Sequence, residues 1–130
     1  VTLLMAVAVQ KAAAAVSSTE TLIKWPNDVI MHGKKITGIL TEMYLKGEEI
    51  DFVVIGTGVN VKAQTFPEEL VNASDIETES GRGVSRKELL EVIVDEFFVL
   101  YEEYVKTGNL RFVKETHEKG QGGAHFRPCR

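Results

Sequence analysis

Residues 21–61 read TLIKWPNDVIMHGKKITGILTEMYLKGEEIDFVVIGTGVNV, and this stretch decides the fold. Its apolar runs are separated by PND, HGK and KGE, which are residue types that favour turns. We therefore predict four strands, at residues 21–25, 29–31, 35–44 and 49–61. Parallel neighbours would need long crossover connections, and the connections here are too short for them. The stretch predicts an antiparallel meander.

Helical patterns flank this stretch on both sides. Residues 2–16 are rich in alanine and apolar on nearly all sides, which predicts a buried helix. Ser85 and Glu88 form a capping box, and the apolar spacing after them predicts a second helix from residue 86 to about residue 106, with Gly108 just beyond its end. We expect both helices to cover one face of the sheet, which is an α+β fold built on a mainly antiparallel sheet.

The remaining segments are shorter and more polar. Pro67 predicts the start of a short helix, residues 72–83 a loop, and residues 110–118 a further short helix. Residues 120–130 hold three glycines, one proline and no acid, and we predict a disordered or non-native tail there. One folded domain is therefore expected over residues 1–119.

Composition excludes several classes of protein. The chain has 130 residues, of which 44% are hydrophobic, as in an ordinary soluble domain. A net charge of −4 and a pI near 5.4 argue against general nucleic-acid binding, which needs a basic patch. The single cysteine, Cys129, allows no internal disulfide. No apolar run reaches the roughly 18 residues of a membrane span, so we predict no membrane partner and a cytoplasmic location.

The block KWPND, residues 24–28, ends a strand in a stiff turn. Pro26 fixes the backbone, while Asn27 and Asp28 can bind local backbone groups or face a ligand. Lys24 and Asp28 could hold a phosphate and its metal ion, because Mg²⁺ prefers carboxylate and phosphate oxygens. The alternative is a plain turn with solvated charges.

The block KITGIL, residues 35–40, combines a lysine and a glycine within an apolar strand. On a regular strand Lys35 shares one face with Thr37, and Gly38 lies on the other face. Gly38 lets a flat ligand come close, and the Lys35 ammonium could stabilise developing negative charge. The alternative is a solvated lysine after a hairpin.

The block IGTGVN, residues 55–60, places two glycines in a core strand. Gly56 and Gly58 remove side chains from one sheet face, which predicts a slot. Asn60 lies on the same face and can form the bidentate hydrogen bond that reads adenine. A β-bulge is the alternative. We predict no metal site from the three dispersed histidines, His32, His117 and His125.

At these separations, the three blocks resemble the catalytic domain of biotin–protein ligases. The resemblance covers residues 2–118, and KWPND is its most specific part. It implies the biotin/lipoate ligase fold, which is similar to that of class II synthetases. It also implies an enzyme, a biotin–[acetyl-CoA-carboxylase] ligase, that uses ATP and Mg²⁺ to convert biotin into biotinyl-5′-AMP. The biotin then passes to one lysine of the biotin carboxyl carrier domain of a carboxylase.

The resemblance also implies roles for individual residues. Lys35 resembles the lysine that contacts the biotin carboxylate and the α-phosphate, so it is the expected catalytic residue. Asn60 resembles the adenine contact. The expected biotin-binding residues are Lys35, Gly38, Ile39, Leu40, Gly56, Thr57 and Gly58. The expected ATP-binding residues are Lys24, Asn27, Asp28 and Asn60.

Two parts of the family are not matched by this chain. The family has an upstream Gly/Arg-rich loop that closes over the ligands and a small β-barrel domain at its end. The resemblance therefore implies a fragment truncated at both ends, with DNA as a partner only if a DNA-binding domain precedes it, and with a homodimer left open. The alternatives are a lipoate–protein ligase of the same fold and a non-enzymatic remnant that binds biotin weakly or dimerises.

Overall fold

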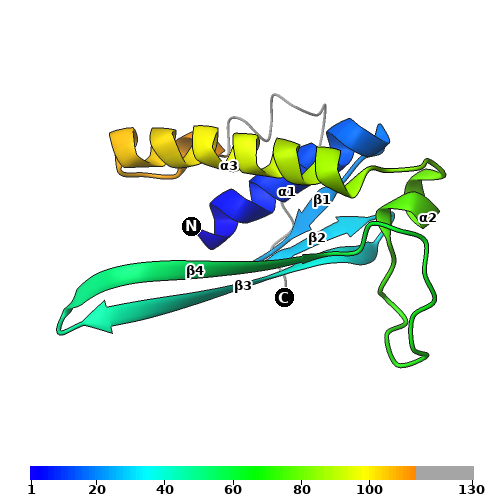
Figure 1. The fold of residues 1–130 in the computed structure, drawn as a ribbon, viewed down its shortest axis with the longest axis horizontal. Helices are drawn as coiled ribbons and strands as arrows, with labels where there is room; N and C mark the ends of the chain where they lie inside the picture. The colour runs from blue at the N-terminus through cyan, green and yellow to red at the C-terminus, as the bar shows by residue number, and fades with distance from the viewer. Residues whose placement is uncertain (114–130) are drawn as a thin grey trace.

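The computed structural model describes residues 1–113, in which four strands form one antiparallel sheet (Figure 1). The strands lie side by side in chain order: β1 (Leu22–Lys24), β2 (Asp28–Met31), β3 (Lys34–Lys46) and β4 (Glu49–Val59). Each strand pairs antiparallel with the next. The predicted meander is confirmed, with strand ends that differ from the prediction by a residue or two.

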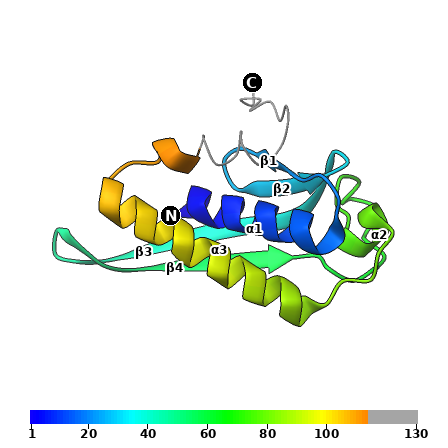
Figure 2. The same cartoon turned by 90° about the horizontal axis from the view of Figure 1, so that it is seen from above.

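Two long helices cover the same face of this sheet (Figures 1 and 2). The first, α1, spans Thr2–Ser17, and the second, α3, spans Arg86–Thr107. α1 contacts β1, β2 and β3, and α3 packs mainly against α1. The prediction that both helices lie on one face is therefore confirmed, and the opposite face of the sheet is left uncovered by them.

The core lies between α1 and the sheet. Its apolar side chains come from both helices, the sheet and the segment between β4 and α3: Val9, Ala12, Ala13, Val29, Met31, Ile36, Val61, Ile76, Val84, Leu89 and Ile93. Two buried polar residues connect α1 to the start of the sheet. Gln10 Nε2 donates to the Thr21 carbonyl over 2.9 Å, and Thr21 Oγ1 donates to the Gln10 carbonyl over 2.8 Å. This reciprocal pair satisfies polar groups that burial would otherwise penalise.

Local capping signals set the ends of α3. Ser85 Oγ accepts from the Glu88 N–H over 3.2 Å, as the capping box predicts. Gly108 has a φ of 66°, and its N–H donates to the Tyr104 carbonyl over 2.8 Å. Both predicted helix ends are therefore confirmed.

A short helix interrupts the segment predicted as a loop over residues 72–83. This helix, α2, spans Ile76–Ser80. Asp75 caps it by accepting from the Thr78 N–H over 2.7 Å, and Gly81 ends it in the left-handed conformation with a φ of 68°. The cap and the glycine are local signals, but the helix is short and polar, so it lacks the apolar periodicity that identifies longer helices.

Other predictions need smaller corrections. The helix expected at Pro67 is only a turn, closed by the Leu70 N–H on the Pro67 carbonyl over 2.9 Å. The helical spacing of the apolar residues between positions 89 and 104 predicts a core face of α3 that includes Leu90 and Tyr101. This prediction is wrong for these two residues, which are 60% and 39% exposed because α3 packs mainly on α1. Of the helix predicted over 110–118, residue 110 lies in a bend, residues 111–113 are helical, and residues 114–118 lie outside the described residues, as does the predicted tail.

Candidate functional site

The three sequence blocks meet in one row across the sheet. Lys24 on β1 pairs with Asp28 on β2, Asp28 pairs with Gly38 on β3, and Gly38 pairs with Gly58 on β4. Directly paired residues present their side chains on the same face of a sheet. The row therefore places a lysine, a carboxylate and two glycines side by side.

An irregularity in β3 places Lys35 on the same face as this row. Lys35 pairs with Ile30 and Thr37 pairs with Val29, so Ile36 is an extra residue between them. A bulge of this kind reverses the alternation of side chains along the strand. The prediction that Lys35 shares a face with Thr37, opposite Gly38, is therefore wrong.

The Lys35 side chain instead extends over Gly38. A β-carbon added at Gly38 would lie 3.4 Å from Lys35 Cε and 3.5 Å from its Nζ. The ammonium reaches the neighbouring strand, where Nζ lies 2.8 Å from Asp28 Oδ1. The lysine side chain remains 49% exposed and the aspartate 21%, so both charged groups are accessible from solvent. Both distances are ordinary van der Waals contacts, so the lysine side chain packs over the open backbone at Gly38 without clashing with an added β-carbon.

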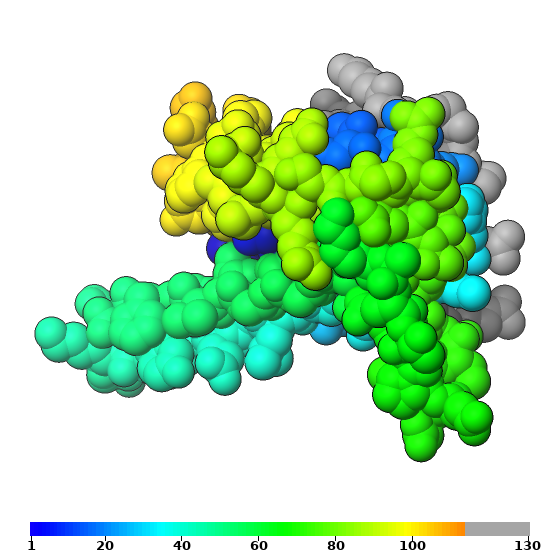
Figure 3. Space-filling model, turned by 45° about the vertical axis from the view of Figure 1, so that its right-hand side comes forward, coloured from blue at the N-terminus to red at the C-terminus, as the bar shows by residue number. Residues whose placement is uncertain are grey.

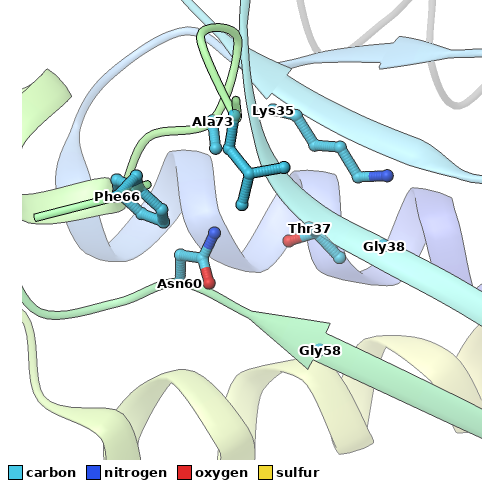
Figure 4. A pocket seen from close by; sticks show the side chains of 8 residues that line it. Lys35, Thr37, Gly38, Gly58, Asn60, Phe66 and Ala73 are labelled. Carbon is cyan, nitrogen blue, oxygen red and sulfur yellow. The ribbon is translucent and has the colours of Figure 1, made fainter. Parts of the chain in front are cut away.

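A hollow of about 340 Å³ opens beside Lys35 (Figure 4). Its lining comes from the first half of β3, the end of β4 and the segment that follows β4: Lys35, Thr37, Gly38, Gly58, Asn60, Phe66, Leu70 and Ala73. The segment that follows β4 lies below the sheet in Figure 1, on the face opposite α1 and α3. We call its residues 62–74 the arm, and in Figure 3 the arm projects away from the helices. The hollow therefore belongs to the face that the helices leave uncovered.

The arm is joined to the sheet by backbone hydrogen bonds. The Lys35 N–H donates to the Asn72 carbonyl over 2.7 Å, and the Ser74 N–H donates to the Lys35 carbonyl over 2.9 Å. Together they form a parallel bridge between Lys35 and Ala73. Ala73 is thereby held against the start of β3, where it closes one side of the hollow.

The residues predicted to bind biotin separate into two groups. Lys35, Gly38 and Gly58 line the hollow. Gly56 and Leu40, which is 66% exposed, form the next pair on the same face and belong to the same group. The second group consists of Ile39 and Thr57, which pair between those two pairs and point their side chains to the helix-covered face.

The residues predicted to bind ATP also differ in their surroundings. Asn60 lines the hollow, and its Nδ2 donates to the Ser74 carbonyl over 3.1 Å. Asn27 connects its turn to β3, because its Nδ2 donates to the Ile39 carbonyl over 2.9 Å and its own carbonyl accepts the Ile39 N–H over 3.1 Å. Asp28 and Lys24 belong to the row described above. Asn27 therefore supports the turn that carries Asp28.

Four residues of the hollow were missed by the sequence analysis: Thr37, Phe66, Leu70 and Ala73. Thr37 is 1% exposed, and its Oγ1 has no hydrogen-bond partner among residues 1–113. A buried hydroxyl without a partner is costly, but Thr37 shares the helix-covered face of the sheet with Ile39, so this hydroxyl gives no evidence of a ligand in the hollow. Phe66 could have been noticed as a lone aromatic residue in a polar segment. Leu70 and Ala73 gave no local signal.

No group of three or more His, Cys, Asp or Glu side chains in residues 1–113 is arranged to hold a metal ion. The chemistry available in the hollow is instead that of an ammonium, a neighbouring carboxylate, an amide side chain and exposed backbone at two glycines. This set suits an anionic ligand attached to a flat, partly apolar group.

Comparison with known proteins finds similarity to biotin ligases and to the family that includes them. The Biotin/lipoate A/B protein ligase family matches residues 1–60. The bifunctional ligase/repressor BirA of Bacillus spizizenii is 37% identical over 126 residues, which are 93% of this chain and 39% of that protein. The biotin–[acetyl-CoA-carboxylase] ligase of Mycobacterium tuberculosis is 46% identical over 56 residues, which are 43% of this chain and 18% of that protein.

Solved structures show the same similarity in three dimensions. The apo biotin protein ligase of Aquifex aeolicus matches with a TM-score of 0.70 at 27% identity, over 79% of this chain and 45% of that one. The same ligase in complex with biotin and ATP matches with a TM-score of 0.69 at 26% identity, over 81% of this chain and 44% of that one. The chain thus spans less than half the length of these relatives. No helix within residues 1–113 is long and apolar enough to cross a membrane.

Proposed function

Because this chain belongs to the biotin/lipoate A/B protein ligase family, we propose that it supplies the biotin- and ATP-binding part of a biotin–protein ligase. The biotin carboxylate attacks the α-phosphorus of ATP, pyrophosphate leaves, and biotinyl-5′-AMP forms. The amino group of a carrier-domain lysine then attacks the acyl carbon, and AMP leaves. The main support is the position of Lys35, which extends over Gly38 beside the hollow and reaches Asp28.

Lys35 supplies the positive charge in this proposal. Its ammonium is exposed enough to exchange its contact with Asp28 for one with a phosphate oxygen. It would offset the negative charge that develops as the carboxylate attacks the phosphorus. Asp28 would then be available to the Mg²⁺ that enters with ATP, because that ion prefers carboxylate and phosphate oxygens.

The glycines and their apolar neighbour supply the biotin surface. Gly38 and Gly58 form one cross-strand pair, and Leu40 and Gly56 form the next pair on the same face. Three of these four positions lack a side chain, which leaves a flat surface for fused rings. Leu40, which is 66% exposed, would cover an aliphatic chain. Ile39 and Thr57 would contribute backbone groups only.

Asn60 and Phe66 supply the nucleotide side of the hollow. The Asn60 side chain uses one Nδ2 proton on the Ser74 carbonyl. Its other Nδ2 proton and its Oδ1 have no hydrogen-bond partner among the described residues and can pair with the adenine edge. The Phe66 ring lines the same hollow and would pack against the base (Figure 4).

The protein substrate and the setting follow from the same proposal. We propose the biotin carboxyl carrier domain of a carboxylase as the acceptor and the cytoplasm as the compartment. We also propose that two copies of the ligase can form a homodimer. DNA binding would require a further domain preceding these residues.

A lipoate–protein ligase is the second candidate, because the matching family includes both activities. ATP–pyrophosphate exchange by a complete ligase that contains these residues distinguishes them. We expect exchange that depends on biotin, with biotinyl-5′-AMP identified by mass spectrometry. Exchange with lipoate or octanoate alone would establish the second candidate. No exchange with any of the three acids would leave the non-enzymatic alternative.

A further inference from the structure

Three carboxylates around α2 hold the arm, residues 62–74, that closes one side of the hollow. Asp75 Oδ2 accepts from the Gln64 N–H over 3.2 Å. Glu77 accepts from Lys62 Nζ over 2.8 Å, and from the N–H groups of Ala63 and Val84 over 3.2 and 2.9 Å. These two residues hold the beginning of the arm.

The third carboxylate, Glu79, holds the end of the arm. Its Oε1 accepts from Ser74 Oγ over 2.6 Å. On its other side it faces the turn between β2 and β3, with Oε2 3.2 Å from His32 Nδ1 and Oε1 3.7 Å from Lys34 Nζ. The Glu79 side chain is only 11% exposed, whereas those of His32 and Lys34 are 57% and 51% exposed. Glu79 therefore lies mostly, but not fully, buried between the arm and the sheet.

Ser74 connects this carboxylate to the hollow. Its carbonyl accepts from Asn60 Nδ2 over 3.1 Å, and its N–H donates to the Lys35 carbonyl over 2.9 Å. The residue before it, Ala73, lines the hollow itself. Ser74 is 4% exposed, so its polar groups depend on these protein hydrogen bonds and not on solvent. A displacement of Ser74 would move the Asn60 amide and the Ala73 wall together.

We propose that Glu79 is a positioning residue for nucleotide binding, which acts through Ser74 to orient Asn60 and hold the arm against β3. The identity of the ligand as ATP rests on the proposed function, while the positioning role rests on the contacts above. Removal of the Glu79 carboxylate should leave the buried Ser74 hydroxyl without its hydrogen-bond acceptor. It should weaken ATP binding about five- to tenfold, which is the effect of one lost hydrogen bond on a binding equilibrium. Biotin binding should change less, because Gly38 and Gly58 lie in strand pairs that Glu79 does not touch.

The experiment compares the single variants Glu79→Ala, Glu79→Gln, Ser74→Ala and Glu96→Ala with a double variant that combines Glu79→Ala and Ser74→Ala. Glutamine retains an oxygen that can accept from Ser74, so Glu79→Gln should keep nearly the parental KM for ATP. Glu79→Ala and Ser74→Ala should each raise that KM, and the double variant should raise it no further, because both remove the same bond. Glu96→Ala is the control and should leave both KM values at the parental level, since Glu96 bonds Lys11 between α1 and α3 and neither Ser74 nor the arm.

Two measurements are made on these variants. Steady-state adenylation by the complete ligase separates the KM for ATP, the KM for biotin and kcat. Amide hydrogen exchange of this chain measures how often the Ser74 and Lys35 N–H groups lose the hydrogen bonds that join the arm to β3. Glu79→Ala should accelerate exchange at these two amides and leave the amide of Ile39, which bonds the Asn27 turn, unchanged.

The outcomes are distinguishable. A purely structural role would lower the active fraction, and hence kcat, with both KM values unchanged, and this would overturn the proposal. Equal effects of Glu79→Gln and Glu79→Ala would show that the charge rather than the Ser74 bond matters, and would also overturn it. If the parent ligase forms no biotinyl-5′-AMP, the proposed function fails, and the exchange rates of Ser74 and Lys35 still decide the positioning role.

Discussion

Replacing Lys35 by alanine should slow adenylation far more than it destabilises the fold. The Lys35 ammonium lies 2.8 Å from Asp28 Oδ1, but the two side chains are 49% and 21% exposed. An ion pair with this much solvent contact is worth at most about 1 kcal/mol. An ammonium that stabilises charge only in the transition state is worth about 2.7–4 kcal/mol, a factor of about 10²–10³ in rate. The rate effect should therefore exceed the stability effect severalfold in free energy.

The measurements are the rate of biotin-dependent ATP–pyrophosphate exchange by the complete ligase and the urea unfolding midpoint of the same variants. Lys11→Ala is the matched control, because Lys11 forms a similar pair with Glu96 over 3.2 Å between α1 and α3. We expect Lys11→Ala to change stability about as much as Lys35→Ala and to leave the exchange rate at the parental level. A Lys35→Ala rate within about threefold of the parent would refute the catalytic role of this residue.

Three further predictions concern the hollow, acid stability and a helix end. Gly58→Val should fold normally, because a β-carbon there meets only the Gly38 carbonyl oxygen at 4.0 Å. The added side chain should weaken the affinity for biotin, measured by calorimetry, about tenfold or more. An unchanged affinity for biotin would exclude Gly58 from the site. Hydrogen bonds to Glu77 from Lys62 first, and from two backbone N–H groups, lower the pKa of this carboxyl from 4.5 to about 2. The contribution of Glu77 to stability is therefore present above pH 4.5 and is lost as the pH falls toward 2. Over that interval the free energy of unfolding should drop more steeply in the parent than in Glu77→Gln. Parallel plots of unfolding free energy against pH would contradict the role given to these hydrogen bonds. Ser85→Ala should cost about 1 kcal/mol of unfolding free energy in urea titration, with no loss indicating that the cap contributes nothing.

The parts of this protein that sequence predicts well depend on local chemistry. Short connections between apolar runs exclude crossover helices, so the antiparallel order of the four strands could be predicted. Ser85 and Gly108 mark the ends of α3 through hydrogen bonds to residues three or four positions away, and the structure contains both bonds. The lysines, carboxylate and glycines of the site were likewise visible, because polar and glycine residues are unusual within apolar strands.

The shape of the hollow, in contrast, depends on contacts between residues far apart in the chain. The sequence alone indicates regular alternation at Lys35, and only the pairing of β2 with β3 leaves Ile36 unpaired and moves the lysine to the face of Gly38. The bridge between Lys35 and Ala73 likewise joins two segments that lie far apart in the chain, beside the hydrogen bond from Ser74 to Glu79. Strand register and buried hydrogen bonds depend on which residues far apart in the chain can bury their apolar side chains and pair their polar groups at the same time. A local pattern of residues does not contain that information.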